Sequence, residues 1–297
     1  MNNRLGLVFT WALILIASPT TIILWRTLAT HEPYWWPWLH GLILLSLLSI
    51  TLIHPILKAL RRFAAIITII YFMGFGGGWN WGLIPFIRSN EIWISWMNTA
   101  PIALQEIALH SLRLTPALLI LLFLLATKRK RADFFLTKGD IHASVGRSRL
   151  LRIKKHEPWI KVASIFAAIF VFGTILFLFG SSEIRWNLLI TNWSLIPVAI
   201  LVALINGFNE EFSLRAAPLG ELEPFIGRPD SLLITTAYFG LGHYYGVPSG
   251  VIGVILSGFL GWLLGKSMLE TRGFLLAWVV HFITDIPIFL FLITGAI

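Results

Sequence analysis

Long stretches without a charged residue dominate this chain and limit what it can fold into. An apolar helix of roughly 20 residues, rising ~1.5 Å per residue, crosses the hydrocarbon core of a bilayer. We therefore predict an all-α, polytopic integral membrane helix bundle with eight or nine membrane segments. The uncharged stretches are Leu5 to Trp25, Pro33 to Leu57, Phe63 to Ile87, Val162 to Ser182, Trp186 to Asn209 and Ser231 to Gly265, and Pro101 to Ala126 and Gly273 to Ile297 contain few polar residues.

The composition supports a membrane protein whose surroundings are the lipid bilayer. Only 12% of the residues are charged and the mean hydropathy is +0.81, whereas about a quarter of the residues of a soluble domain are charged. The first apolar stretch is longer than that of a signal peptide and has no clear cleavage site, so we expect it to be retained. The absence of cysteine excludes disulfides, thiol nucleophiles and cysteine-based metal sites.

The positive charge is concentrated in one loop. Of the 23 Lys and Arg residues, eleven lie between Lys128 and Lys161. Such a cluster between apolar stretches is typical of a cytoplasmic loop that contacts lipid head groups, and we expect no nucleic-acid partner. We accordingly divide the chain into an N-terminal transmembrane region (1–127), a basic cytoplasmic loop (128–161) and a C-terminal transmembrane core (162–297) in the cell membrane.

One polar stripe occurs in the N-terminal region. Glu106, His110 and Arg113 follow at i, i+4 and i+7 and therefore share a helical face. Ionisable residues within membrane spans are often functional. We interpret this stripe instead as structural, with its three members neutralising one another.

The C-terminal core contains polar residues that local pairing does not explain. Glu211 and Arg215 are four residues apart and can form an ion pair. Glu210 points about 100° away from Glu211 and lacks that partner. We expect Pro218 to end this helix near the cytoplasmic surface.

Two histidines complete the constellation. His243 follows Phe239 by one helical turn, and His281 precedes Asp285 by the same spacing. Counting from the expected cytoplasmic helix ends places Glu210 and both histidines at depths of roughly 12 to 18 Å. A buried carboxylate beside an imidazole can deprotonate a water, and His281 and Asp285 can hold the substrate carbonyl.

These residues carry a resemblance to a known family. The patterns EExxxR, FxxxH and HxxxN/D resemble the three motifs of the CAAX-protease and bacteriocin-processing (CPBP) family, the Rce1-type glutamate intramembrane proteases. The resemblance extends from about Trp186 to the C-terminus and follows the family order. Its residues here are Glu210, Glu211, Arg215, Phe239, His243, His281 and Asp285.

The resemblance implies a CAAX prenyl endopeptidase-like hydrolase without cofactor or metal. Its substrate would be a membrane-associated peptide or protein, either prenylated or leader-bearing. Glu210 and His243 would activate the water, and His281 and Asp285 would lie on the oxyanion side. Glu211, Arg215 and Phe239 would be scaffolding. Because several members have Asn at position 285 and an ionised Asp cannot donate a hydrogen bond, we expect Asp285 to fix His281.

Two other classes of function remain open. A zinc metalloprotease could use Glu210, His243 and His281 as ligands, although HExxH is absent. A non-catalytic scaffold, immunity protein or transporter could keep the same residues. A transporter is favoured by the helix break from Gly246 to Pro248 but not by the lack of a visible repeat.

Overall fold

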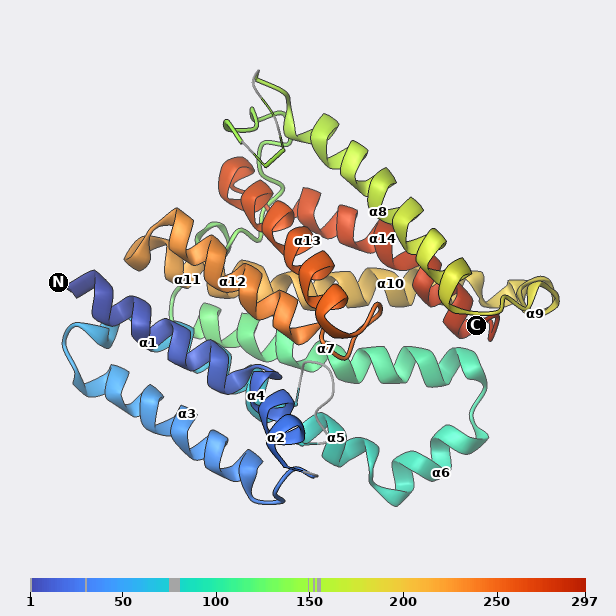
Figure 1. Cartoon of the computed structure of the whole chain (residues 1–297), viewed down its shortest axis with the longest axis horizontal. Coiled ribbons are helices and arrows are strands. Elements are labelled where there is room, and N and C mark those ends of the chain that lie inside the picture. The colour runs from blue at the N-terminus through green and yellow to red at the C-terminus, as the bar shows by residue number, and fades with distance from the viewer. Residues whose placement is uncertain (1, 30, 75–80, 149, 152, 154–155) are drawn as a thin grey trace. The chain divides into compact units, whose positions relative to one another are not determined.

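The computed structural model describes residues 2–29, 31–74, 81–148, 150–151, 153 and 156–297 (Figure 1). Within these ranges the chain forms helices and two isolated bridges, Ser144 with Pro158 and Ser148 with Ile153, and no strand. The all-α prediction is confirmed. The α-helices are α1 (Asn2–Ala17), α2 (Thr20–Leu28), α3 (Trp36–Ile53), α4 (Arg61–Met73), α5 (Leu83–Arg88), α6 (Glu91–Thr99), α7 (Ile102–Ala126), α8 (Trp159–Ser181), α9 (Trp186–Thr191), α10 (Ile196–Glu211), α11 (Ala217–Ile226), α12 (Arg228–Gly242), α13 (Gly250–Thr271) and α14 (Leu275–Ile293). Short 3-10 helices are η1 (Leu57–Leu60), η2 (Arg131–Phe134) and η3 (Trp193–Leu195), and η4 (Phe212–Ala216) is a π-helix.

Six helical segments of the described chain are long and apolar enough to cross a bilayer. They are α3, α7, α8, α13, α14 and the continuous run Trp193–Ile226, and the pair α1 and α2, bent by 61°, makes a seventh if it is one span. The protein is therefore a multi-pass membrane protein. Fewer segments qualify than the eight or nine predicted, because α4, with 13 residues, and α12, with 15, are shorter than the length that crosses a bilayer. Gly74, in the left-handed conformation (φ 68°), ends α4 within the stretch predicted to continue to Ile87, of which residues 75–80 lie outside the described residues.

The chain folds into two compact units that interleave along the sequence. Unit 1 comprises Met1–Asn90, Pro116–Phe135 and Phe212–Lys266, and unit 2 comprises Glu91–Thr115, Leu136–Glu211 and Ser267–Ile297. Each unit thus combines segments from both sides of the basic loop. The division into regions 1–127, 128–161 and 162–297 stays a prediction.

In unit 1, α1, α3, α4, α11 and α12 pack around a core of large apolar side chains. Phe63 and Ile67 of α4 are fully buried. Tyr71 Oη donates to the carbonyl oxygen of Pro37 at 2.7 Å, which ties α4 to the start of α3. The helix α4 is therefore held on its neighbours by apolar packing and by one buried hydrogen bond.

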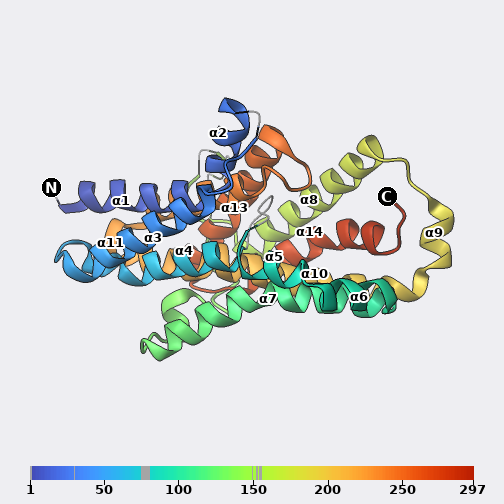
Figure 2. The ribbon, with the colours of Figure 1, turned by 90° about the horizontal axis from the view of Figure 1, so that it is seen from below.

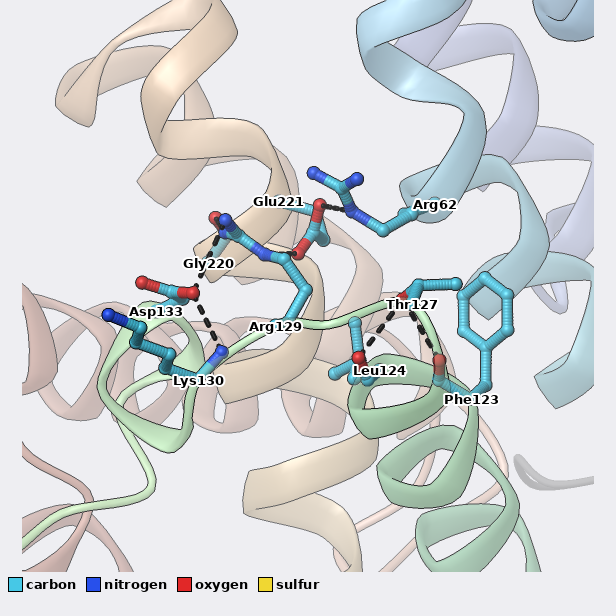
Figure 3. A network of polar contacts seen from close by, with 9 residues as sticks. All are labelled: Arg62, Phe123, Leu124, Thr127, Arg129, Lys130, Asp133, Gly220 and Glu221. Atoms are coloured by element: carbon cyan, nitrogen blue, oxygen red, sulfur yellow. Dashed lines mark hydrogen bonds and ion pairs between the residues drawn. The ribbon is translucent and has the colours of Figure 1, made fainter.

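A buried carboxylate anchors the beginning of the basic loop in unit 1 (Figure 3). Glu221 of α11, 3% exposed, accepts from Arg62 Nε at 2.6 Å and from Arg129 Nε at 2.7 Å. Arg129 also donates to the Gly220 carbonyl at 3.3 Å, and Asp133 accepts from the backbone nitrogen of Lys130 at 2.8 Å. Arg129, which belongs to the loop expected to contact lipid head groups, therefore joins Arg62 in pairing with an acid inside the fold.

The expectation that Pro218 ends its helix is wrong. The chain passes from α10 through the π-turn η4 into α11, which continues to Ile226. Pro218 lies in the first turn of α11, where the missing N–H and the fixed φ of proline are tolerated. The depth of Glu210 that was counted from Pro218 therefore does not hold.

In unit 2, α10 and α8 both pack against α14, side by side in both views (Figure 1, Figure 2). Gly207 lies at the crossing of α10 and α14, where an added Cβ would lie 3.2 Å from the backbone nitrogen of Phe282. Trp278 Nε1 donates to the Leu204 carbonyl at 3.1 Å, and the Phe208 ring contacts the rings of Phe274 and Trp278. Glycine thus permits a close helix approach that aromatic rings then fill.

Replacing Gly207 by leucine is expected to destabilise the protein by about 1–3 kcal/mol, because backbone atoms of α14 cannot yield to the new side chain without a helix shift. Gly173→Leu in α8 is the matched control, since nothing lies within 4 Å of an added Cβ there. It should leave the melting temperature unchanged or raise it. Thermal unfolding of the purified variants in detergent measures both. Equal melting temperatures would show that α10 and α14 do not need this contact.

Candidate active site

Four ionisable residues of two predicted motifs meet where α10 and α14 cross in unit 2. Glu210 and Glu211 end α10, and His281 and Asp285 lie one turn apart in α14. All four are buried. The two glutamates of the EExxxR motif therefore lie beside the histidine and aspartate of the HxxxN/D motif.

His281 lies between three carboxylates. Its Nδ1 donates to Glu211 Oε1 at 2.6 Å, since an ionised carboxylate only accepts. Its Nε2 lies 3.7 Å from Glu210 Oε2 and 3.6 Å from Asp285 Oδ1. The bond at Nδ1 fixes the ring orientation and directs Nε2 toward the other two acids.

Glu211 has a partner on another helix that spacing along its own helix did not indicate. We expected Asp285 to fix His281 and Glu211 to be scaffolding. In the structure, Glu211 bonds to Nδ1 of His281, and Asp285 faces the opposite ring nitrogen, Nε2. The ion pair of Glu211 with Arg215 stays a prediction. Spacing within one helix shows which residues share a face but not which residue lies across from them.

Asn206 is a site residue that the sequence reasoning missed. Its Nδ2 donates to Asp285 Oδ2 at 2.9 Å and to Glu210 Oε1 at 3.2 Å. It lies one helical turn before Glu210 and is buried. The sequence signal that could have identified Asn206 was a single amide four residues before an acid on an otherwise apolar helix.

Arg113 approaches the same acid from α7. Its Nη2 is 4.0 Å from Glu210 Oε1. The stripe interpretation holds for Glu106 and His110, where His110 Nδ1 lies 2.9 Å from the Glu106 carbonyl oxygen and 3.7 Å from its carboxylate. Arg113 also acts on Glu106 through its charge, as the stripe interpretation expects, and its approach to Glu210 is an additional contact that the sequence did not predict.

Phe239 and His243, the second motif, lie in unit 1, where their rings stack with the guanidinium of Arg215. The Arg215 guanidinium lies 4.3 Å from the centre of the Phe239 ring, and this ring lies 4.4 Å from that of His243. His243 Nδ1 donates to the Phe239 carbonyl at 2.8 Å, so in the neutral ring Nε2 is the acceptor. Arg215 and Phe239, which we expected to be scaffolding, thus help to orient the ring of His243. The pairing of His243 with Glu210 stays a prediction.

Metal binding was tested on the arrangement of the side chains. In the described ranges, no group of three or more His, Asp or Glu residues is placed so that it could hold a metal ion. The three residues named for the zinc alternative include His243, which belongs to unit 1, whereas Glu210 and His281 belong to unit 2.

Comparison with known families agrees with the motifs. Residues 192–287 match the family model described as type II CAAX prenyl endopeptidase Rce1-like. No curated protein and no solved structure matches the chain significantly. The matched segment contains all three motifs and Asn206, whereas Arg113 lies outside it. Residues 192–287 of this multi-pass membrane protein are therefore similar to the Rce1-like type II CAAX prenyl endopeptidases.

Proposed function

We propose that this protein is an intramembrane endopeptidase that hydrolyses a peptide bond of a membrane-associated, prenylated or leader-bearing peptide. The observation that carries the proposal is the buried cluster of Glu210, His281, Asp285 and Asn206 within the Rce1-like segment. Four interacting polar side chains between two apolar helices are costly in a membrane protein and are typical of functional sites. A cluster of this kind favours an enzyme over a scaffold or immunity protein.

Glu210 is the proposed general base. Its Oε2 and His281 Nε2 are 3.7 Å apart, so one water oxygen can lie at hydrogen-bond distance from both. Asn206 donates to the other carboxylate oxygen and keeps the reactive oxygen directed toward the histidine. His243, with its Nε2 as acceptor, is the proposed second group that orients this water.

In the proposed reaction, the water oxygen forms a bond to the scissile carbonyl carbon while one of its protons moves to Glu210. The π electrons of the carbonyl become the charge of an oxyanion. The oxyanion then re-forms the carbonyl, the C–N bond breaks, and the proton on Glu210 passes to the leaving nitrogen.

Glu210→Gln is expected to lower turnover at least ~10²-fold with little change in KM, because the amide keeps the shape but cannot take a proton. His243→Ala should lose a comparable factor, and the double variant should lose little more, since groups that act as one unit are not additive. The measurement is cleavage of farnesylated and leader-bearing peptides in liposomes. Glu157→Gln, which removes an exposed acid paired with Lys161, is the matched control.

The same assay tests the alternatives. Wild-type turnover by Glu210→Gln would overturn the glutamate mechanism. Loss of activity on strong chelation and its return with Zn²⁺ would favour the zinc metalloprotease. Lack of cleavage together with saturable uptake of a small molecule would favour a transporter.

Glu211→Gln is expected to lower turnover at least ~10-fold without a matching rise in KM, because an amide no longer stabilises the protonated ring or enforces a donor at Nδ1. The ¹⁵N spectrum of His281 should then show a mixture of tautomers. Glu270→Gln is the control. Glu270 accepts from Trp159 Nε1 at 2.9 Å and from the Gly146 nitrogen at 3.0 Å, away from His281, so its loss should affect stability alone. An unchanged spectrum and turnover for Glu211→Gln would contradict the orienting role.

We also propose that the site opens toward the cytoplasm, as the basic loop indicates. The chain has no cysteine, so single cysteines report sidedness directly. Lys138→Cys should react with an impermeant maleimide only from the cytoplasmic side, and Arg88→Cys only from the outer side. The reverse pattern in oriented vesicles would invert the proposed topology.

A further inference from the structure

Two hydrogen-bond donors of the α10–α14 cluster, His281 Nδ1 and Asn206 Nδ2, are engaged with its own acids. His281 Nδ1 donates to Glu211, and Asn206 Nδ2 donates to both Glu210 and Asp285. Asp285, in the ionised form, has only acceptors. Hydrolysis of a peptide bond creates negative charge on the carbonyl oxygen, and this charge requires a donor or a cation.

Arg113 supplies a cation at this place. Its Nη2 is 4.0 Å from Glu210 Oε1, which is longer than a hydrogen bond but within the range of direct charge attraction. Its side chain is 35% exposed, so the guanidinium extends from the buried acid toward accessible space. The N–H groups of the guanidinium that do not face Glu210 can donate to a ligand oxygen on the exposed side.

We propose that Arg113 is a catalytic residue that donates to the scissile carbonyl oxygen and stabilises the oxyanion. The proposal rests on the endopeptidase function described above and adds a role for α7, which lies outside the Rce1-like segment. A guanidinium suits this task because it stays charged and offers five N–H donors in a planar fork.

The local charge makes a cation necessary. Glu210, Glu211 and Asp285 surround one imidazole. An oxyanion that forms beside these acids is repelled by those that remain ionised while Glu210 holds the proton. Arg113 offsets this repulsion on the Oε1 side of Glu210, away from the oxygen that faces His281. The water can thus lie on the Oε2 side of Glu210 while the carbonyl oxygen accepts from Arg113.

The residue at 285 gives the proposal a specific consequence. An asparagine at this position would offer an amide donor near His281 Nε2, whereas Asp285 offers only a charge of the wrong sign. A donor restored at 285 should therefore compensate for a donor lost at 113. A purely structural arginine would show no such exchange.

The first experiment compares Arg113→Ala and Arg113→Lys in the liposome assay. Arg113→Ala should lower kcat ~10²-fold with KM nearly unchanged, the usual effect of removing one oxyanion donor. Arg113→Lys, which keeps the charge, should recover at least ~10-fold of that loss. A peptide phosphinate, whose tetrahedral anion resembles the intermediate, should bind Arg113→Ala more weakly by a similar factor. Arg88→Ala, an exposed arginine of unit 1, is the matched control.

The second experiment adds Asp285→Asn or Asp285→Leu to Arg113→Ala. Asparagine should raise kcat at least ~10-fold above that of Arg113→Ala alone, whereas leucine, which removes the charge without adding a donor, should not. Equal recovery by both would show that Arg113 only balances the charge of Asp285 and would overturn the oxyanion role. Thermal unfolding of each variant confirms that the folded protein is compared.

The outcomes separate the two proposals. If the wild type cleaves and Glu210→Gln does not, while Arg113→Ala keeps the wild-type kcat and phosphinate affinity, the role of Arg113 is wrong and the endopeptidase function stands. If the wild type neither cleaves the peptides nor binds the phosphinate, the endopeptidase function is wrong, and the role of Arg113 with it.

Discussion

The close crossing of α10 and α14 is the contact on which the candidate site depends. Glycine at position 207 lets the two backbones approach, and this approach brings acids at the end of one helix to the histidine on the other. Apolar packing alone gives little preference for one helix pair over another inside lipid, because lipid tails are equally apolar. Small residues at the crossing and the polar contacts beside it supply that preference.

Both units contain buried acids, and each acid is met by donors from distant parts of the chain. In unit 2, Glu211 is paired with His281 and Glu210 is approached by Asn206, His281 and Arg113. In unit 1, two arginines share Glu221. A carboxylate in a membrane bundle is tolerated only when such partners offset its desolvation. The two sites differ in geometry, because the arginines of unit 1 bond directly to Glu221 whereas Arg113 stays 4.0 Å from Glu210.

The sequence predicted the helical class, most of the membrane segments and the motifs, because hydropathy over 20 residues and spacing of 3.6 residues per turn are local properties. It could not give contacts between helices. The spacing pointed to Arg215 as a partner for Glu211 and gave no sign of His281, which bonds to it from another helix. The stripe predicted the action of Arg113 on Glu106 but not its approach to Glu210 of another helix. Pro218 was read as a helix end because the π-turn before it, which carries the chain into α11, has no clear sequence signal.

The shared carboxylate of Glu221 has a consequence for the order in which the protein assembles. Glu221 follows Arg129 by 92 residues and Arg62 by 159. Both arginines are therefore synthesised, and can be anchored at the membrane surface by their charge, well before the acid leaves the ribosome. The acid that both arginines bind is thus the last of the three side chains to be synthesised.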